Sequence, residues 1–285
     1  VDISELVQRD AKTGIQRVVR NILREWLQHP PAGYRVEPVY ATLEQPYRYA
    51  RQFTSHFLGV AEPAGTDEPI DFTSEDIFFA LDLQPQVQTA QATFYQHMRR
   101  QGVIVKFLVH DILCVLEPQY FVEGAAKGYT DWLHVVGDTD GVICVSRCVA
   151  NELEQWMKAH IWKRQRRFTI DWSHNGAGLG IIPTQSEPRK PAGELIKRLG
   201  DGEVFLMVGT VEPRKGHSQV LDAFEQLWRD KHEMNLVIVG KEGWLVENLS
   251  GRLRNHAELN KRLFWLNSSN DEQLEQVYAA SSCLI

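Results

Sequence analysis

Short apolar runs alternate along this chain with amphipathic stretches of helical length, and this alternation restricts the possible fold more than any other feature. A strand followed by a helix, repeated, is how parallel sheets covered by helices are built. In the first part of the chain we expect strands at 35–40, 76–81, 103–109, 141–145 and 168–171, with helices at 14–26, 87–100, 119–134 and 147–160. The pattern therefore predicts an α/β fold around a mostly parallel sheet.

The alternation stops over residues 181–193, where Pro183, Pro188 and Pro191 prevent a regular element. It then restarts, with strands expected at 204–208, 236–239 and 263–266 and helices at 217–229, 246–259 and 270–279. We therefore expect two Rossmann-like domains, residues 1–180 and 194–285, joined by a linker at 181–193. Both ends fall inside apolar runs, so the second domain is expected to be incomplete.

One stretch, residues 45–69, is polar with interspersed aromatics and shows no period. A structureless loop of this length is uncommon in a compact domain. The stretch is therefore either functional or contains an element that the sequence does not reveal.

Composition and charge narrow the class of protein. The 285 residues are 43% hydrophobic with a formal net charge of -6, which argues against general nucleic-acid binding because phosphate contacts need a basic face. The four cysteines lack paired C-x-x-C spacing and fit neither a disulfide framework nor a zinc site, so we expect a reducing, cytoplasmic setting. No apolar run approaches the ~20 residues that span a bilayer, and no leader opens the chain. Any membrane contact is expected to be peripheral.

The segment from Gly209 to His217 has the order strand, glycine, tight turn, helix. A helix start offers unpaired N–H groups and a partial positive charge, and Arg214 and Lys215 would add two cations there. Because cations are unfavourable against the helix dipole, their position suggests that an anion such as a diphosphate binds beside them. The alternative is that both are solvated turn residues; the ordered strand, glycine and helix favour the anion site.

The run VGTVEPRKGHSQVLDAFEQLW, which begins at Val208, resembles the start of the second domain in GT4 glycosyltransferases. The resemblance implies a GT-B fold, with two Rossmann-like domains whose parallel sheets face each other across a cleft and the second domain truncated. It also implies that Arg214, Lys215, Thr210 and Gly209 bind the donor diphosphate. Many GT4 enzymes carry an arginine at the position of Thr210, so Arg214 is expected to supply the second cation.

Two segments of the first domain extend the resemblance. The run TGIQR at 13–17 is similar to the glycine loop of polysaccharide mannosyltransferases of this family, where Gly14 would let the backbone approach substrate and Arg17 would face the cleft. A solvated helix face explains Arg17 equally well. His110 and Asp111 follow a strand at the carboxyl end, where α/β sheets bind ligands, and VHDIL resembles the family segment near the transferred sugar. The resemblance makes them the candidate catalytic residues, although a strand-end histidine is often only hydrogen-bonded structure.

In the second domain the resemblance places Gly240 and Lys241 beside the nucleotide, and Leu266 would bring backbone to the base. An ordinary strand and turn is the competing interpretation for both segments. Trp172 to Ala177 resembles the last strand and loop of the first domain, where contact with ligand stays open.

The activity implied by the resemblance is retaining transfer of a sugar, mannose as the best guess, from a nucleoside diphosphate sugar to a saccharide or lipid-linked acceptor in surface polysaccharide (O-antigen) synthesis. GDP-mannose is the favoured donor, with GDP- or dTDP-linked deoxysugars as alternatives. No metal-ligand cluster is evident in the sequence, so we expect no cofactor and a metal-independent reaction. The paired glutamates, E-x7-E, that GT4 enzymes carry would follow Ile285.

Two other interpretations stay open. A sugar-nucleotide epimerase on the same fold would need a similar diphosphate site, and a non-catalytic transferase-like scaffold would keep the fold alone. A dinucleotide-dependent oxidoreductase is disfavoured because no G-x-G-x-x-G follows a strand. Separately, the basic residues between 158 and 167 could contact anionic lipid, although a solvated helix end also accounts for them.

Overall fold

The computed structural model describes residues 1–11, 13–61, 65–160, 167–176, 197–200 and 202–285. The chain divides into two compact units, one formed by Val1–Pro118 with Glu123–Gly178 and the other by Gln119–Val122 with Leu179–Ile285. The linker predicted at 181–193 lies outside the described residues. No helix in the described parts of the chain is long and apolar enough to cross a membrane.

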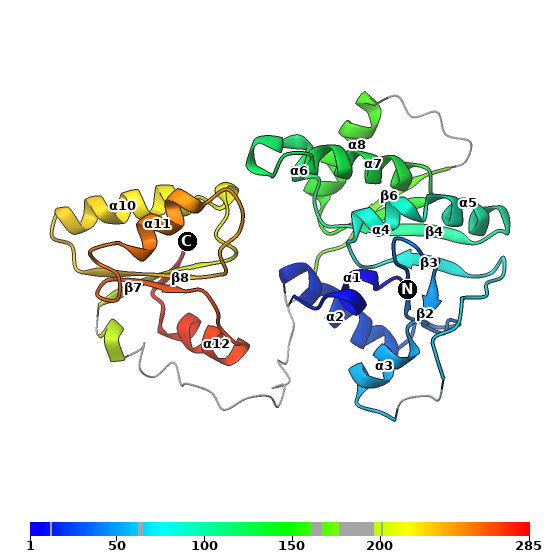
Figure 1. The fold of residues 1–285 in the computed structure, drawn as a ribbon, viewed down its shortest axis with the longest axis horizontal. Helices are drawn as coiled ribbons and strands as arrows, with labels where there is room; N and C mark the ends of the chain where they lie inside the picture. The colour runs from blue at the N-terminus through cyan, green and yellow to red at the C-terminus, as the bar shows by residue number, and fades with distance from the viewer. Residues whose placement is uncertain (12, 62–64, 161–166, 177–196, 201) are drawn as a thin grey trace. The chain divides into compact units, whose positions relative to one another are not determined.

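The first unit is a parallel sheet with helices on both faces (Figure 1). Its elements from the N-terminus to residue 109 are α1 (Ser4–Gln8), α2 (Gly14–Gln28), β1 (Val39–Tyr40), β2 (Arg48–Tyr49), α3 (Arg51–Leu58), β3 (Ile77–Ala80), α4 (Pro85–Ala90), α5 (Ala92–Arg100) and β4 (Ile104–Val109). The remaining elements are α6 (Leu113–Leu116), the 3-10 turn η1 (Pro118–Tyr120), whose last two residues are assigned to the second unit, α7 (Ala125–Gly137), β5 (Gly141–Cys144), α8 (Arg147–Ala159) and β6 (Thr169–Trp172).

The strand order of this sheet is β3-β4-β5-β6, all parallel. Asp2 extends it, because its backbone pairs in parallel with Val39 of β1 on one side and Ala80 of β3 on the other. Side chains alternate between the two faces of each strand. Phe107 packs into one core with residues of α4, α5, α7 and α8, whereas the next residue, Leu108, packs into a second core with α1 and α2.

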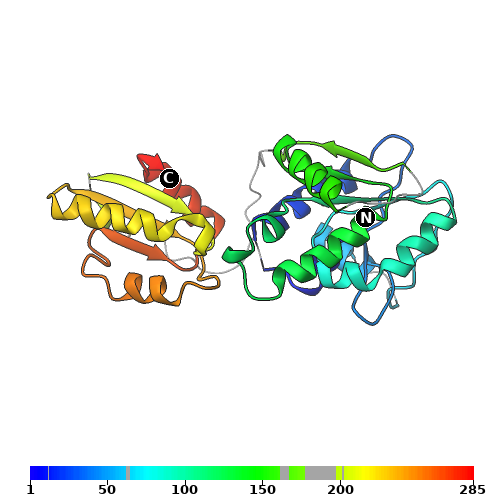
Figure 2. The ribbon, with the colours of Figure 1, turned by 90° about the horizontal axis from the view of Figure 1, so that it is seen from above.

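The second unit contains β7 (Glu203–Val208), the 3-10 turn η2 (Pro213–Lys215), α10 (His217–Arg229), β8 (Met234–Val239), α11 (Glu247–Arg254), β9 (Leu263–Leu266), α12 (Asp271–Ala280) and β10 (Cys283–Leu284). Its strand order is β10-β7-β8-β9, again parallel. Within this unit α10 and α11 cover one face of the sheet and α12 covers the other (Figure 1, and turned in Figure 2). Leu236 and Ile238 of β8 face α10 and α11, and Val237 and Val239 face α12.

The parallel sheets and most elements were predicted correctly, and α10 and β9 begin and end at the predicted residues. The strand predicted at 35–40 is wrong for its first part: only Val39 and Tyr40 pair, and Pro38 before them has no N–H for a ladder. The helix predicted at 87–100 is divided at Gln91, whose side-chain amide bonds the carbonyls of Thr42 and Gln45 at 2.9 and 3.2 Å. Contacts with a distant segment of the chain therefore interrupt the helix that the local hydrophobic period predicts.

Two other boundaries differ from expectation. The helix predicted at 119–134 begins only at Ala125, because Gly124 adopts a left-handed conformation (φ 80°) before it. The helix predicted at 246–259 ends at Arg254. The stretch at 45–69 contains the short strand β2 and the helix α3, which answers the question that its lack of period left open.

Candidate functional site

The topology of the second unit selects one edge of its sheet. From β7 the chain passes through α10 to β8 and through α11 to β9 on one side, and α12 then carries it back to β10 on the other side of β7. In open α/β sheets, ligands bind outside the carboxyl ends of the strands where the order reverses in this way. The reversal lies between β7 and β10, so the loop after β7, residues 209–216, borders the expected crevice.

This loop is held against the loop that follows β8 by close backbone contact. Gly209 has a φ of 144°, which L side chains rarely adopt. A Cβ on Gly240 would overlap the carbonyl oxygen of Gly209 and lie 2.6 Å from its carbonyl carbon. Beyond the glycines, the Val211 N–H donates to the Lys241 carbonyl and the Gly243 N–H donates to the Val211 carbonyl, both at 2.9 Å. The pairing of β7 with β8 therefore continues into the two loops.

Backbone bonds also align the three strand ends. The Gly209 N–H donates to Val239 at 2.9 Å, and the Gly240 N–H donates to the Leu266 carbonyl at 3.0 Å. The indole of Trp265 donates to the Gly240 carbonyl at 3.0 Å. The residues predicted for this domain from three separate strands, Gly209, Gly240 and Leu266, thus lie in one row at the carboxyl edge, with Thr210 and Lys241 exposed beside them.

The two predicted cations occupy a 3-10 turn just before α10. Arg214 is bound to a carboxylate, because its guanidinium lies 2.8 Å from Glu212 Oε1. The Glu212 side chain is 3% exposed and that of Arg214 is 29% exposed, so Glu212 fixes the orientation of the guanidinium. Lys215 is exposed. Gly216 then begins α10 in a left-handed conformation (φ 74°) without a side-chain cap, so the first-turn N–H groups of α10 have no intrahelical partner.

The first unit has its own reversal point at Asp2. The chain moves from Asp2 to β1 on one side and then to β3 on the other, so the loops after Asp2 and after β3 border the expected crevice. The TGIQR segment follows this loop and begins α2. Thr13 and Gln16 form a capping box, in which each side chain accepts the other's backbone N–H at 3.3 Å. These two residues have a structural role, whereas Gly14 and Arg17 are exposed at the helix start.

Beneath this reversal point lies a buried network of polar side chains. The Asp2 carboxylate accepts hydrogen bonds from Ser4 Oγ at 2.6 Å, Tyr47 at 3.0 Å and Gln88 at 3.1 Å. Asp82, directly after β3, accepts from the backbone N–H groups of Leu6 at 2.6 Å and Leu83 at 2.9 Å.

The environment of Asp82 makes it a proton-binding group near neutral pH. Burial raises its pKa to about 7, the nearby Asp2 and Glu5 add to the rise, and the two backbone N–H donors oppose it. Burial likewise raises the pKa of Asp2. The sequence prediction missed Asp82, although its position after an apolar strand was the available signal.

His110 and Asp111 lie at the carboxyl end of β4 as predicted from the sequence. His110 is 8% exposed, its Nε2 is buried without a hydrogen-bond partner, and burial lowers its pKa while Asp111 opposes the shift. Asp111 Oδ1 accepts the Leu113 N–H at 3.1 Å, and its carbonyl accepts the Tyr129 hydroxyl at 2.8 Å. Asp111 therefore holds the segment that leads into α6, and His110, with its unpartnered Nε2, is the better candidate for contact with substrate.

Two further segments have a clear local role. Ser146 caps α8, since its Oγ accepts the Val149 N–H at 3.2 Å. Trp172 ends β6 with 43% of its surface exposed, and Arg147 lies 5.7 Å from its ring centre. Of the basic residues between 158 and 167, Lys158 pairs with Glu154 at 2.8 Å and Arg167 is exposed. The cations at 163, 164 and 166 lie outside the described residues.

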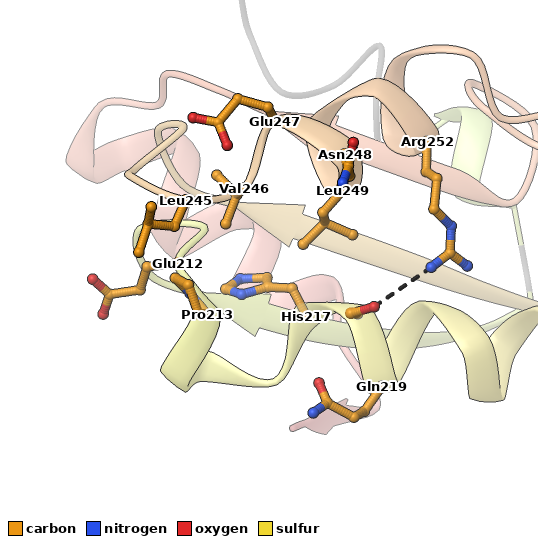
Figure 3. A pocket seen from close by; sticks show the side chains of 11 residues that line it. Glu212, Pro213, His217, Gln219, Leu245, Val246, Glu247, Asn248, Leu249 and Arg252 are labelled. Carbon is orange, nitrogen blue, oxygen red and sulfur yellow. Dashed lines mark hydrogen bonds between the residues drawn. The ribbon is translucent and has the colours of Figure 1, made fainter. Parts of the chain in front are cut away.

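Three residues that matter to the second unit's site were not singled out from the sequence. Glu212 orients Arg214, Gly243 allows the two loops to approach, and the buried His217 borders a pocket beside α10 (Figure 3). A Cβ on Gly243 would lie 2.7 Å from the Val211 carbonyl oxygen. None of these roles produces a sequence signal of its own, because each depends on contacts that form only in the folded chain.

Comparison with known proteins gives a family match and two similar proteins. Residues 196–285 match the family "Glycosyl transferases group 1". Over its whole length the chain is 43% identical to a serotype-specific mannosyltransferase, WbdA, of Escherichia coli, and 42% identical to a second protein of that name from the same species. It covers 34% and 35% of these proteins, so the chain spans about a third of the length of the curated relatives it matches.

Solved structures agree on the fold. The chain is similar to a trehalose 6-phosphate synthase from Burkholderia multivorans, with a TM-score of 0.52, 13% identity, and coverage of 75% of this chain and 50% of that one. A UDP-forming trehalose-phosphate synthase from Burkholderia xenovorans gives a TM-score of 0.50 at 14% identity, covering 75% of this chain and 53% of that one. The protein therefore has the α/β architecture of a GT-B glycosyltransferase with a partial second domain. Its residues 196–285 carry a group 1 glycosyltransferase domain.

Proposed function

We propose that this chain is the nucleotide-sugar-binding part of a mannosyltransferase that transfers mannose from a nucleoside diphosphate mannose, GDP-mannose first, to a saccharide or lipid-linked acceptor in surface polysaccharide synthesis. The observation that carries the proposal is the 43% identity, over the whole chain, with mannosyltransferases. A sugar-nucleotide epimerase and a non-catalytic scaffold explain this identity less directly.

The loop after β7 supplies the chemistry that departure of a diphosphate requires. As the bond to the sugar breaks, negative charge grows on the leaving phosphate oxygens, and donors fixed in advance stabilise that charge most effectively. Arg214, held by Glu212, offers a guanidinium of set orientation, Lys215 adds a second cation, and the uncapped start of α10 adds N–H groups. We propose that these groups replace a metal ion, so turnover should persist in the presence of EDTA.

The first unit would hold the sugar and the acceptor. His110 has a buried ring nitrogen without a partner at the carboxyl end of β4, which suits a hydrogen bond to a sugar hydroxyl. Gly14 and Arg17 at the start of α2 border the same edge of the sheet. We propose retention at the anomeric carbon, and NMR of the product linkage would test it.

The most direct test is calorimetric titration of the full-length protein with GDP, UDP and dTDP. We expect Lys215→Ala to weaken GDP binding about tenfold, since a hydrogen bond to a charged group contributes about 1.5–3 kcal/mol. Arg229→Ala is a matched control, because it removes one cation from the far end of the same helix. If Lys215→Ala binds GDP as the parent does, the diphosphate assignment is wrong.

Membrane contact is a separate proposal, and it would be electrostatic, through basic residues between 158 and 167. Part of this segment is already neutralised by the Lys158–Glu154 pair. Sedimentation with vesicles that contain anionic lipid, at low and high salt, would test it, because such binding weakens as salt increases.

A further inference from the structure

An exposed tryptophan lies at the carboxyl edge of the first unit's sheet. Trp172 is the last residue of β6, and 43% of its surface is exposed. Trp132 and Trp228 are 0% and 7% exposed, and their indole N–H groups donate to protein at 2.7 and 2.9 Å. The Trp172 indole, in contrast, has no acceptor among the described residues. It therefore offers a ligand both an apolar ring and an N–H donor.

Arg147 lies beside this ring without a carboxylate partner. It is the half-buried first residue of α8, and its guanidinium carbon is 5.7 Å from the centre of the Trp172 ring, within the range of about 6 Å for a cation–π contact. No carboxylate of the described residues pairs with it, unlike Arg99, which pairs with Asp140 at 2.9 Å. The dipole of α8 opposes a cation at this end of the helix. The indole ring therefore orients the guanidinium, and its N–H donors stay available.

His174 completes the group. Its exposed ring has its centre 5.2 Å from that of Trp172, with the two ring planes at 79°. This edge-to-face contact holds an imidazole, which can donate and accept hydrogen bonds, beside the indole. The three side chains thus surround an aromatic surface with polar groups.

The register of the sheet relates this group to His110. Val109, Cys144 and Trp172 are paired across β4, β5 and β6, and His110 follows Val109 directly. Neighbouring strands lie about 4.8 Å apart, so Trp172 lies roughly 10 Å along the edge from the end of β4. One sugar ring cannot reach across this distance, but a short oligosaccharide can.

The chemistry of the group fits a neutral sugar ring. A pyranose presents an apolar C–H face, which complements an indole ring, and a rim of hydroxyl groups. The planar guanidinium of Arg147 can donate to two neighbouring hydroxyls at once, and the imidazole and the indole N–H can bond others. An anion would find one cation in this group, Arg147, and would leave the aromatic surface unused.

We propose that Trp172, Arg147 and His174 form a subsite for a sugar of the acceptor chain, beyond the sugar that receives the new unit. Trp172 stacks on the sugar ring, and Arg147 donates to its hydroxyls. That the chain is a mannose-containing acceptor rests on the proposed function. Such a subsite would make the enzyme prefer an oligosaccharide to a single sugar as acceptor.

The test compares a short and a long acceptor with the full-length protein and GDP-mannose. We expect the KM for an α-linked mannotriose to be about tenfold lower than the KM for methyl α-mannoside, and Trp172→Ala to remove this difference. The loss should appear in KM rather than in kcat, because the subsite lies away from the reacting sugar. Trp172→Phe should keep most of the preference, since it retains an aromatic ring. An unchanged KM for mannotriose in Trp172→Ala, or no preference in the parent, would overturn the proposal.

Tyr34→Ala is the matched control for loss of an exposed aromatic. Tyr34 is 51% exposed and lies in the same unit, in the segment that leads from α2 into β1. Its replacement should leave the KM of both acceptors unchanged. If Trp172→Ala raises the KM of both acceptors equally and lowers the unfolding temperature, the indole has a structural role and the proposal is wrong.

A binding measurement separates this subsite from the proposed function. The indole ¹⁵N–¹H signal of Trp172, identified by its absence in Trp172→Phe, should shift when mannotriose is added without donor. If GDP-mannose is not a substrate but this signal shifts, the donor assignment falls and the subsite stands. If mannose is transferred and the signal does not shift, the reverse holds. A shift with inorganic phosphate or GDP, and none with mannotriose, would also overturn the subsite.

Discussion

The two sheets of this protein bring functional residues to their carboxyl edges by different means. In the second unit the edge is shaped by backbone: a side chain on Gly240 would collide with the Gly209 carbonyl, and Gly209 has a φ of 144°, which L side chains rarely adopt. In the first unit the edge rests on buried polar side chains around Asp2 and Asp82. One edge is fixed by glycines, which have no side chain, and the other by hydrogen bonds that buried side chains make with each other and with backbone.

This difference has consequences for how each edge responds to change. A steric arrangement is insensitive to pH and fails abruptly when an atom is added. A hydrogen-bonded arrangement of carboxyl groups tolerates small changes in volume but depends on protonation, because buried carboxylates are costly without a cation partner. Mutation and pH should therefore change the stability of the two units differently.

The largest effect should come from Gly240→Ala. The new methyl group would overlap the Gly209 carbonyl, and backbone on both sides prevents a simple shift, so we expect the second unit to lose more than about 3 kcal/mol of stability, the upper part of the range for overpacking. Thermal unfolding followed by circular dichroism measures this change.

Gly251→Ala is the matched control for the steric comparison. It adds the same methyl group within α11, where nothing lies within 4 Å of the new Cβ. It should stabilise the protein by about 0.5–1 kcal/mol. Equal effects of the two substitutions would show that the contact between the loops does not limit residue 240.

The next largest effect should be a pH dependence of the first unit. The pKa of Asp82 is about 7 in the folded protein against 3.8 for an ordinary aspartate, so between these values the folded state binds more protons than the unfolded state. Stability therefore falls as pH rises through this window, by about 2 kcal/mol between pH 5 and pH 7 from this group.

Asp82→Asn should flatten this part of the profile, because the amide does not titrate. The slope should not vanish, since burial raises the pKa of Asp2 as well. Urea unfolding of both proteins at several pH values gives the comparison, and parallel profiles for parent and variant would contradict the role given to Asp82.

The fold and part of the candidate site could be predicted from the sequence, and the difference between the two edges shows why the rest could not. The alternation of strands and helices predicted both parallel sheets, and the order strand, glycine, helix located the loop at Gly209 and Arg214. Secondary structure and the order strand, glycine, helix can be predicted because they depend on residues that are neighbours in the sequence. The family resemblance added Gly240 and Leu266, which the structure brings into one row with Gly209.

What the sequence could not provide are contacts that form only in the folded chain, whether their residues are near or far in sequence. Glu212 could not be recognised as the partner of Arg214, since a glutamate in a turn is usually solvated. Asp111 is a candidate catalytic residue by resemblance, and the sequence did not reveal that its carboxylate accepts the Leu113 N–H. Asp82 gains its proton affinity from burial beside Asp2, 80 positions earlier in the chain. Each of these roles arises only after folding.

The smallest expected effect concerns Gly14, the one predicted site glycine that occupies ordinary helical backbone. A Cβ there meets nothing within 4 Å, so Gly14→Ala should stabilise α2 by about 0.4–1 kcal/mol. If the glycine serves only the helix, GDP binding will be unchanged. If it lets the backbone approach the donor, as the resemblance implies, GDP binding in the full-length protein will weaken although stability rises. Weaker GDP binding together with higher stability would show that Gly14 is needed for ligand binding. Gly240→Ala, in contrast, should lower both GDP binding and stability.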